Sequence, residues 1–291
     1  MKSTNLTPSI LSPSAPIGIF DSGVGGLSVY QAVRHALPAE DIIYIADSGH
    51  APYGDRSSEF IKERAIAMTE FLVAAGAKAV VVACNTATVI AVDQLRRQFS
   101  IPIIALEPAI KPAIEHSQSG TIGVLATRKT IESPAVERLC RTHGANSRVL
   151  LQPCPGFVEQ VERGEMDHPD TYDLIRHYVE PLLAAGADTL VLGCTHYVYL
   201  TQQIRAIVGP DVTILDSSVA VARQVGRRIG SSEVAASAGR CAQDQFFTTA
   251  ASTGHASAVM STLVGRPVEV RYAETTRPAS AVETETAHTR T

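Results

Sequence analysis

The chain has 291 residues, of which 45 % are hydrophobic and 19 % charged, and its formal net charge is −4. This length accommodates one large or two ordinary domains, and the apolar content is sufficient for a substantial core. The acidic balance lacks the electrostatic footprint of a nucleic-acid-binding protein, and no run approaches the roughly 18 apolar residues needed to span a bilayer.

The two ends of the chain are predicted to be flexible tails. Residues 1–13 lack the long apolar stretch and the cleavage site of a signal peptide, and residues 275–291 are polar and poor in aliphatic side chains. The cysteines, at positions 84, 140, 154, 194 and 241, form no CxxC pair and no cluster with histidine. We therefore predict a cytoplasmic protein with free thiols, no disulfide framework and no bound metal.

Short hydrophobic runs alternate with longer amphipathic stretches through most of the chain. Strands are predicted at residues 16–20, 41–46, 79–83, 102–106, 121–126, 147–152, 189–193 and 211–215. Helical periodicity covers residues 57–76 and 168–187, and each stretch closes with a glycine, as expected at a helix C-terminus. The alternation predicts βαβ units, and hence an α/β fold with mainly parallel sheets.

Two segments 110 residues apart are nearly identical in pattern. VAAGAKAVVVACNT (residues 73–86) and LAAGADTLVLGCTH (residues 183–196) both run from a helix end through a hydrophobic strand to a cysteine. Such a repeat predicts two pseudo-symmetric α/β lobes. Ligands of open α/β sheets bind beyond the carboxyl ends of the strands, so we expect an active site in the cleft between the lobes.

The expected lobe boundaries follow from the crossings between the two repeats. The proline-containing stretch 107–115 is expected to lead from the first lobe into the second, and the chain is expected to return near Asp216. The first lobe then comprises residues 14–110 and 216–270, and the second comprises residues 111–215. Residues 216–265 are expected to form helices that pack on the first lobe.

Two loops near the N-terminus carry groups suited to a small anionic ligand. GIFDSGVGGLSV (residues 18–29) places Asp21 and Ser22 before a glycine-rich turn into a helix, where backbone N–H groups favour a carboxylate or phosphate. The alternative is a structural turn with Asp21 as helix cap. The second loop, ADSGHAPYGDRS (residues 46–57), displays Tyr53 and the backbone of Gly54, unless it is an ordinary loop.

Cys84-Asn85-Thr86 and Cys194-Thr195-His196 are the most informative segments. A thiol at a strand end, immediately before a helix, experiences a field that lowers its pKa toward neutrality. His196 is placed to exchange a proton with Cys194 or to stabilise its thiolate. Two such thiols on facing lobes suggest a base on one side of a carbon and an acid on the other, which is the arrangement that stereoinversion at an α-carbon requires.

Inversion also needs groups that stabilise a carbanionic transition state around the substrate carboxylate. Hydroxyl and amide side chains in the expected cleft are of the right type; they are Ser22, Asn85, Thr86, Thr127 and Thr195. Asp21 is suited either to accept a hydrogen bond from the substrate ammonium or to tune the protonation of Cys84. Cys140, Cys154 and Cys241 are predicted to be structural.

The segments FDSGVGGLSV, DSGHAPYG, ACNTAT, GVLATRKTIES and LGCTHY together resemble the glutamate racemase family, over roughly residues 16–265. The resemblance implies a cofactor-independent enzyme whose catalytic acid/base pair is Cys84 and Cys194. It also implies auxiliary roles for Asp21, His196 and a glutamate that corresponds to Glu159. Implied substrate contacts are Asp21, Ser22, Tyr53, Gly54, Asn85, Thr86, Thr195 and His196.

The resemblance further implies a homodimer that acts on glutamate and supplies D-glutamate for peptidoglycan synthesis in the bacterial cytoplasm. One departure is the loop YIADSGHAPYG, where many members carry a GDT-type sequence. Three alternatives are weighed against this interpretation. The first is a sister racemase that acts on aspartate or another amino acid, and His196 speaks against aspartate. The second is a non-catalytic anion-binding module built on the glycine loop, which needs no thiol in each lobe. The third is a thiol redox protein, whose two cysteines would be too far apart across a ligand cleft to form a disulfide.

Overall fold

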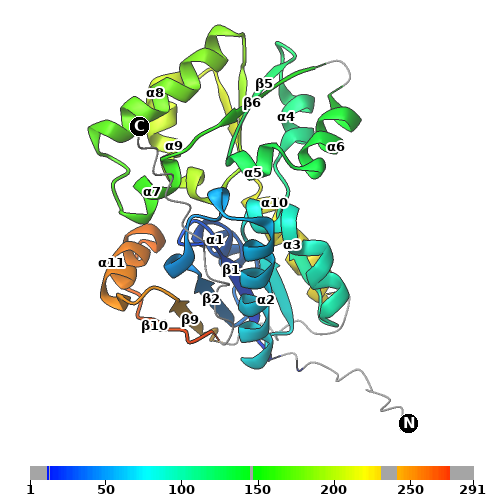
Figure 1. Cartoon of the computed structure of the whole chain (residues 1–291), viewed down its shortest axis with the longest axis vertical. Helices are drawn as coiled ribbons and strands as arrows, with labels where there is room; N and C mark the ends of the chain where they lie inside the picture. The colour runs from blue at the N-terminus through cyan, green and yellow to red at the C-terminus, as the bar shows by residue number, and fades with distance from the viewer. Residues whose placement is uncertain (1–11, 13, 145–146, 231–240, 276–291) are drawn as a thin grey trace, which may run out of the picture.

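The computed structural model describes residues 12, 14–144, 147–230 and 241–275, and they form two α/β lobes, each built around its own sheet (Figure 1). The predicted tails, residues 1–13 and 275–291, fall almost entirely outside the described residues. All paired strands are parallel, as the alternating sequence pattern predicts.

The first lobe contains the larger sheet, with strand order β10-β9-β2-β1-β3-β4. Its strands are β1 (Ile17–Asp21), β2 (Ile42–Ala46), β3 (Ala79–Val82), β4 (Ile103–Ala105), β9 (Asp244–Thr248) and β10 (Val270–Tyr272). Its helices are α1 (Leu27–Ala36), α2 (Ser58–Ala74), α3 (Asn85–Gln98), α10 (Ser218–Gly230) and α11 (Thr253–Val264). Strands β1, β2 and β3 are buried along their whole length, as continuous hydrophobic runs covered on both faces must be.

The second lobe contains a sheet with strand order β6-β5-β7-β8. Its strands are β5 (Thr121–Ala126), β6 (Arg148–Pro153), β7 (Thr189–Leu192) and β8 (Thr213–Leu215). Its helices are α4 (Ile110–His116), α5 (Arg128–Ile131), α6 (Pro134–His143), α7 (Phe157–Glu162), α8 (Pro169–Ala184) and α9 (Thr201–Val208). Three short 3₁₀ helices of the described chain border the lobes: η1 (Ser48–His50), η2 (Tyr53–Asp55) and η3 (Thr195–Leu200).

The two sheets repeat one another. In the first sheet, β1 lies between β2 and β3, and β3 lies between β1 and β4. In the second sheet, β5 lies between β6 and β7, and β7 lies between β5 and β8. The order β2-β1-β3-β4 therefore corresponds to β6-β5-β7-β8, and β3 corresponds to β7. This confirms the structural repeat that the two cysteine-containing segments predict.

The predicted helices are confirmed together with their end signals. The side chain of Ser57 caps α2 by accepting a hydrogen bond from the backbone N–H of Phe60, at 3.2 Å. Gly76 and Gly186, just beyond α2 and α8, have φ values of +85° and +91°, which L side chains rarely adopt. Glycine at these two positions lets each chain segment turn from its helix into the following strand.

The eight predicted strands are all present, but the C-terminal region differs from the prediction. Residues 216–265 were expected to be helical, yet β9 lies within them and pairs with β2, while β10 follows and pairs with β9. Each strand has five residues or fewer, and neither is a continuous aliphatic run. Their strand conformation comes from pairing with an existing sheet edge rather than from local periodicity.

The chain passes between the lobes twice, before α4 and before α10. Helix α4 packs against β5, β7 and α6 of the second lobe, whereas α10 packs against α1 and β4 of the first. The crossings touch one another, because the Ser217 hydroxyl donates a hydrogen bond to the Glu107 carbonyl oxygen.

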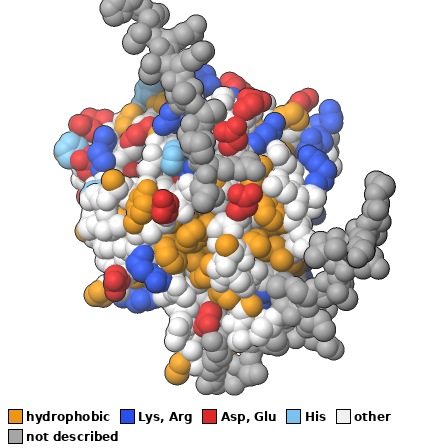
Figure 2. Space-filling view, turned by 60° about the horizontal axis from the view of Figure 1, so that its bottom comes forward, with side chains coloured by type: hydrophobic (Ala, Val, Ile, Leu, Met, Phe, Trp, Pro, Cys, Tyr) orange, Lys and Arg blue, Asp and Glu red, His pale blue; other side chains and the backbone are white. Residues whose placement is uncertain are grey.

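Figure 2 views the end of the molecule formed by the first lobe. Hydrophobic side chains gather near the middle of this face, and Lys and Arg side chains lie among Asp and Glu side chains around it. Among the described residues, no helix combines the length and apolar character needed to cross a membrane.

Candidate active site

Cys84 and Cys194 occupy equivalent positions in the two lobes. Each lies two residues beyond its strand, Cys84 after β3 and Cys194 after β7. Their backbones are alike, with φ and ψ of −139° and 118° at Cys84 and of −144° and 136° at Cys194. Both side chains are buried. The repeat in the sequence has therefore produced a pair of thiols in matching local geometry.

Cys84 is the N-cap of α3. Its Sγ accepts a hydrogen bond from the Ala87 backbone N–H at 3.5 Å and lies 3.5 Å from the Ser22 hydroxyl oxygen. Burial, and then the neighbouring charge of Asp21, raise the pKa of Cys84 well above its usual value. The sequence predicts a thiol activated by the helix field, so the sign of the shift differs from that prediction: desolvation of the buried thiol outweighs the field.

Asp21 is the last residue of β1, in the lobe that carries Cys84, and its side chain also contacts the lobe that carries Cys194. Its carboxylate accepts hydrogen bonds from the backbone N–H groups of Ser22, at 2.7 Å, and Gly26, at 2.6 Å. Thr195 of the second lobe donates its hydroxyl to the same carboxylate at 3.3 Å. Burial raises the pKa of Asp21. Asp21 thus caps the glycine-rich turn and also contacts the opposite lobe.

His196 connects Cys194 to two carboxylates. Its Nδ1 lies 4.0 Å from Sγ of Cys194 and 3.9 Å from a carboxylate oxygen of Asp21, and its Nε2 lies 2.6 Å from a carboxylate oxygen of Glu162. Burial lowers the pKa of His196, but its hydrogen bonds to Cys194 and Glu162 and the charge of Asp21 outweigh burial and raise it well above the usual value. The surroundings of His196 therefore favour its protonated form, and the ring lies beside Cys194.

The glutamate that contacts His196 is Glu162, whereas the resemblance implied Glu159 as the auxiliary glutamate. The two residues lie one turn apart on α7, and sequence spacing alone did not distinguish them. Glu162 also accepts hydrogen bonds from the backbone N–H of Val24, at 2.7 Å, and from the hydroxyl of Ser48, at 3.0 Å, both in the first lobe. Glu159 instead lines a cavity between the lobes.

The loop that carries Tyr53 and Gly54 is tied to a buried aspartate that the sequence analysis did not single out. Asp47 accepts hydrogen bonds from Arg64, at 2.7 and 2.9 Å, from Thr249, at 2.7 Å, and from the Tyr53 hydroxyl. Tyr53 was expected to display its hydroxyl to a ligand; it is buried and its hydroxyl is committed to Asp47. In the sequence, a single aspartate just after the predicted strand 41–46 is only a weak signal that its side chain anchors this loop.

Hydroxyl groups from both lobes meet beside this loop. The Thr86 hydroxyl of the first lobe lies 2.9 Å from that of Thr127 and 3.3 Å from that of Thr130 in the second. Gly54 packs on Thr127 so closely that a Cβ at Gly54 would lie 3.2 Å from the Thr127 Cβ. Asn85, the first residue of α3, is buried next to Thr86. Gly54, Thr86 and Thr127, three of the predicted substrate contacts, are therefore brought together from separate segments of the chain.

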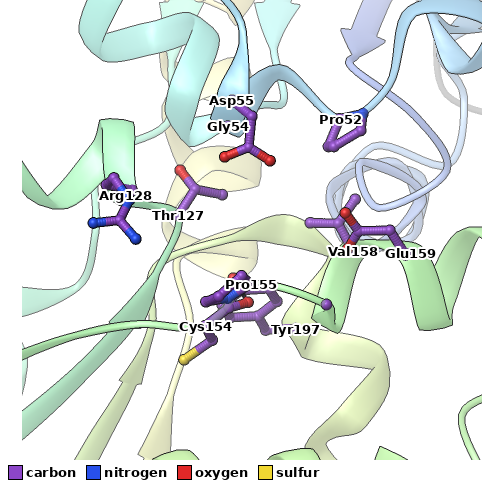
Figure 3. Close-up of a pocket in the computed structure, with 11 residues that line it drawn as sticks. Pro52, Gly54, Asp55, Thr127, Arg128, Cys154, Pro155, Val158, Glu159 and Tyr197 are labelled. Carbon is purple, nitrogen blue, oxygen red and sulfur yellow. Dashed lines mark hydrogen bonds between the residues drawn. The ribbon is translucent and has the colours of Figure 1, made fainter. Parts of the chain in front are cut away.

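A cavity of about 50 Å³ opens between the lobes at this point (Figure 3). Its lining residues are Pro52, Gly54 and Asp55 of the first lobe, and Thr127, Arg128, Cys154, Pro155, Gly156, Val158, Glu159 and Tyr197 of the second. Cys84 and Cys194 do not line it, but Tyr197 does, and its backbone N–H donates a hydrogen bond to the Cys194 carbonyl oxygen at 3.1 Å. The cavity therefore adjoins the side of the site occupied by the second thiol.

Residues 17–225 match the family model described as Asp/Glu/Hydantoin racemase. Glutamate racemase of Ectopseudomonas mendocina is 46 % identical over 257 residues, which cover 88 % of this chain and 97 % of that protein. The chain belongs to the glutamate racemase family. Family membership identifies it as an amino-acid racemase, an isomerase, and confirms the resemblance carried by its five sequence segments.

Solved structures of glutamate racemases have the same fold. The glutamate racemase isoform of Bacillus anthracis superposes with a TM-score of 0.81 at 33 % identity, over 89 % of this chain and 97 % of that one. Glutamate racemase from Francisella tularensis, determined in complex with D-glutamate, gives 0.77 at 28 % identity, over 89 % and 97 %. The likeness extends over both lobes, so the two-lobe arrangement is that of the glutamate racemases.

Proposed function

We propose that this racemase interconverts L- and D-glutamate by proton transfer between two cysteines, without a cofactor. The observation that carries the proposal is the equivalent placement of Cys84 and Cys194 at the ends of corresponding strands. A substrate α-carbon held between two such thiols presents one face to each lobe. Glutamate is the proposed substrate because a relative with this fold has been determined with D-glutamate bound.

The chemistry consists of two proton transfers. A thiolate removes the α-proton from one face, the C–H electron pair remains on carbon as the carbanion, and the opposite thiol protonates the other face. The two thiols have exchanged protonation states at the end of a turnover, so the reverse reaction uses the same groups in exchanged roles. No electron is gained or lost overall.

The two thiols have different neighbours. Burial and the Asp21 carboxylate favour the neutral thiol at Cys84, which is the form of a proton donor. The imidazole of His196 lies 4.0 Å from Sγ of Cys194, where it can exchange a proton with that thiol. We propose that Cys194 removes the proton from L-glutamate and that Cys84 removes it from D-glutamate, and that Glu162 and Asp21 hold His196 in place.

The carbanionic transition state requires donors around the substrate α-carboxylate. We propose that these are Ser22, Asn85, Thr86, Thr127 and Thr195, whose polar groups converge from both lobes. The backbone of the Tyr53-Gly54 turn, rather than the Tyr53 hydroxyl, would contact the substrate, because Asp47 occupies that hydroxyl.

We also propose that the enzyme is a cytoplasmic homodimer that supplies D-glutamate for peptidoglycan. The five cysteines are free, which agrees with a reducing compartment. The assembly and the place in cell-wall synthesis rest on the resemblance to the glutamate racemases.

The test is isotope exchange. The protein is incubated with L-glutamate in D₂O without added cofactor, while circular dichroism follows inversion and proton NMR follows loss of the α-proton signal. Inversion together with deuterium incorporation is the expected result; neither inversion nor exchange would refute the racemase proposal. L-Aspartate as parallel substrate discriminates the sister activity, because faster turnover of aspartate would reassign the substrate.

A further inference from the structure

The cavity between the lobes is bordered by three charged side chains that the two-cysteine mechanism does not use. Asp55 comes from the first lobe, and Arg128 and Glu159 come from the second. Within the described part of the chain, none of the three has an ion-pair partner. Asp55 and Arg128 are exposed and Glu159 is half-buried, so the cavity meets solvent where these charges lie.

The sign of these charges matters for an anionic substrate. Glutamate carries a net charge of −1 at neutral pH, and the carboxylates of Asp55 and Glu159 repel it. Arg128 is the single cation among the residues that line this cavity. Its planar guanidinium offers paired N–H donors that match a carboxylate.

Arg128 is also fixed in position relative to the site. It is the first residue of α5 and directly follows Thr127, the N-cap of that helix. The Thr127 hydroxyl is held by those of Thr86, at 2.9 Å, and Thr130, at 3.0 Å. Figure 3 shows Thr127 between the Arg128 and Asp55 side chains, with Glu159 across the cavity. The backbone under Arg128 is thus anchored to the hydroxyl cluster, while its charge reaches the rim.

We propose that Arg128 captures a carboxylate of the incoming amino acid at the rim of the interlobe cavity and passes it to the hydroxyl cluster at Thr86 and Thr127. This inference rests on the proposed racemase function. Arg128 acts on association and not on proton transfer, because the thiols that carry out the chemistry lie deeper and do not line this cavity.

The expected kinetic signature is a fall in kcat/KM without a fall in kcat. Electrostatic steering raises association rates at low salt and is screened as salt increases. Arg128→Ala should therefore lower kcat/KM for L-glutamate about tenfold at low ionic strength, leave kcat within about twofold, and flatten the salt dependence of kcat/KM. Arg128→Lys, which restores the charge but not the paired N–H donors, should recover part of the loss.

Arg138→Ala is the matched control, because it removes one positive charge from an exposed position on α6 of the same lobe, outside the cavity. Its kcat/KM and salt dependence should equal those of the parent protein. The inference is overturned if Arg128→Ala leaves both quantities unchanged, if it lowers kcat in parallel with kcat/KM, or if Arg128→Lys is as impaired as Arg128→Ala. It is also overturned if Arg138→Ala has the same effect, because the loss then reflects net charge alone.

Failure of this inference is distinguishable from failure of the proposed function. If the protein is not a racemase, the parent chain itself shows no α-proton exchange with saturating glutamate in D₂O. If only the capture role is wrong, the parent exchanges and inverts glutamate, and Arg128→Ala does so with unaltered kcat/KM.

Discussion

Glu162 and His196 are joined by a 2.6 Å contact between Oε1 and Nε2, although they come from different segments of the second lobe. The same Glu162 oxygen accepts the backbone N–H of Val24 in the first lobe. The orientation of the imidazole toward Cys194 is therefore coupled to the contact between lobes. This carboxylate is a positioning group for the histidine, and it gives the clearest test of the site.

Glu162→Gln should impair turnover, whereas Glu159→Gln should not. The amide removes the negative charge that favours the imidazolium, so His196 becomes less basic and less firmly oriented. We expect kcat to fall about tenfold or more, with the basic limb of its pH profile moving to lower pH. Glu159→Gln, one turn away on the same helix, should stay within about twofold. The reverse ranking would return the auxiliary role to Glu159.

Cys84→Ala and Cys194→Ala should each abolish racemisation. A two-base mechanism needs a proton acceptor on one face and a donor on the other, so either loss should cost about a hundredfold to ten-thousandfold in kcat. Racemisation followed by circular dichroism measures this. Cys140→Ala on α6, where the thiol is half-buried, is the control and should retain activity. Full activity in either active-site variant would contradict the two-cysteine assignment.

Gly25→Ala should damage the site through His196. A Cβ at Gly25 would lie 2.3 Å from Nδ1 of His196 and 2.6 Å from its backbone nitrogen, so the histidine or the glycine turn must shift. Overpacking of this kind costs about 1–3 kcal/mol, and displacing His196 should lower kcat as well. Gly254→Ala on α11, where an added Cβ meets no atom within 4 Å, should leave kcat and the melting temperature unchanged. Equal behaviour of the two variants would show that the turn does not position His196.

Asp47→Asn should destabilise the first lobe at neutral pH and much less in acid. Burial raises the pKa of Asp47, but its hydrogen bonds to His50, Arg64 and Tyr53 outweigh burial, and the net shift is downward. A lowered pKa in the folded state contributes stability that is complete above the unfolded-state pKa of about 3.9 and is lost as the pH falls through the folded-state pKa.

The substitution leaves the buried Arg64 guanidinium without its carboxylate, which costs about 3 kcal/mol at pH 7. Urea unfolding of parent and variant at pH 7 and at pH 3 measures the difference, which should shrink at the lower pH. Asp93→Asn, which removes an exposed partner of Arg96, should change stability by less than about 0.5 kcal/mol. A pH-independent difference for Asp47→Asn would show that packing, and not charge, is lost.

Much of the fold was predictable because its signals are local. A strand covered on both faces must be a continuous hydrophobic run, so β1, β3, β5 and β7 are visible in the sequence, and a glycine must follow α2 and α8 because the chain turns there with positive φ. The repeated run ending in a cysteine was enough to pair Cys84 with Cys194. Strands β9 and β10 lacked such a signal, because an edge of an existing sheet determines them.

Only the tertiary structure determines the properties that depend on burial and on contacts between residues that are distant in the sequence. The choice of Glu162 over Glu159 depends on which carboxylate of α7 reaches His196, and periodicity does not encode that distance. The Tyr53 hydroxyl donates a hydrogen bond to Asp47, because a buried carboxylate needs hydrogen-bond donors. The sequence by itself determined that a thiol follows β3, but the pKa of Cys84 was decided by the desolvation and the Asp21 carboxylate that folding imposes on it.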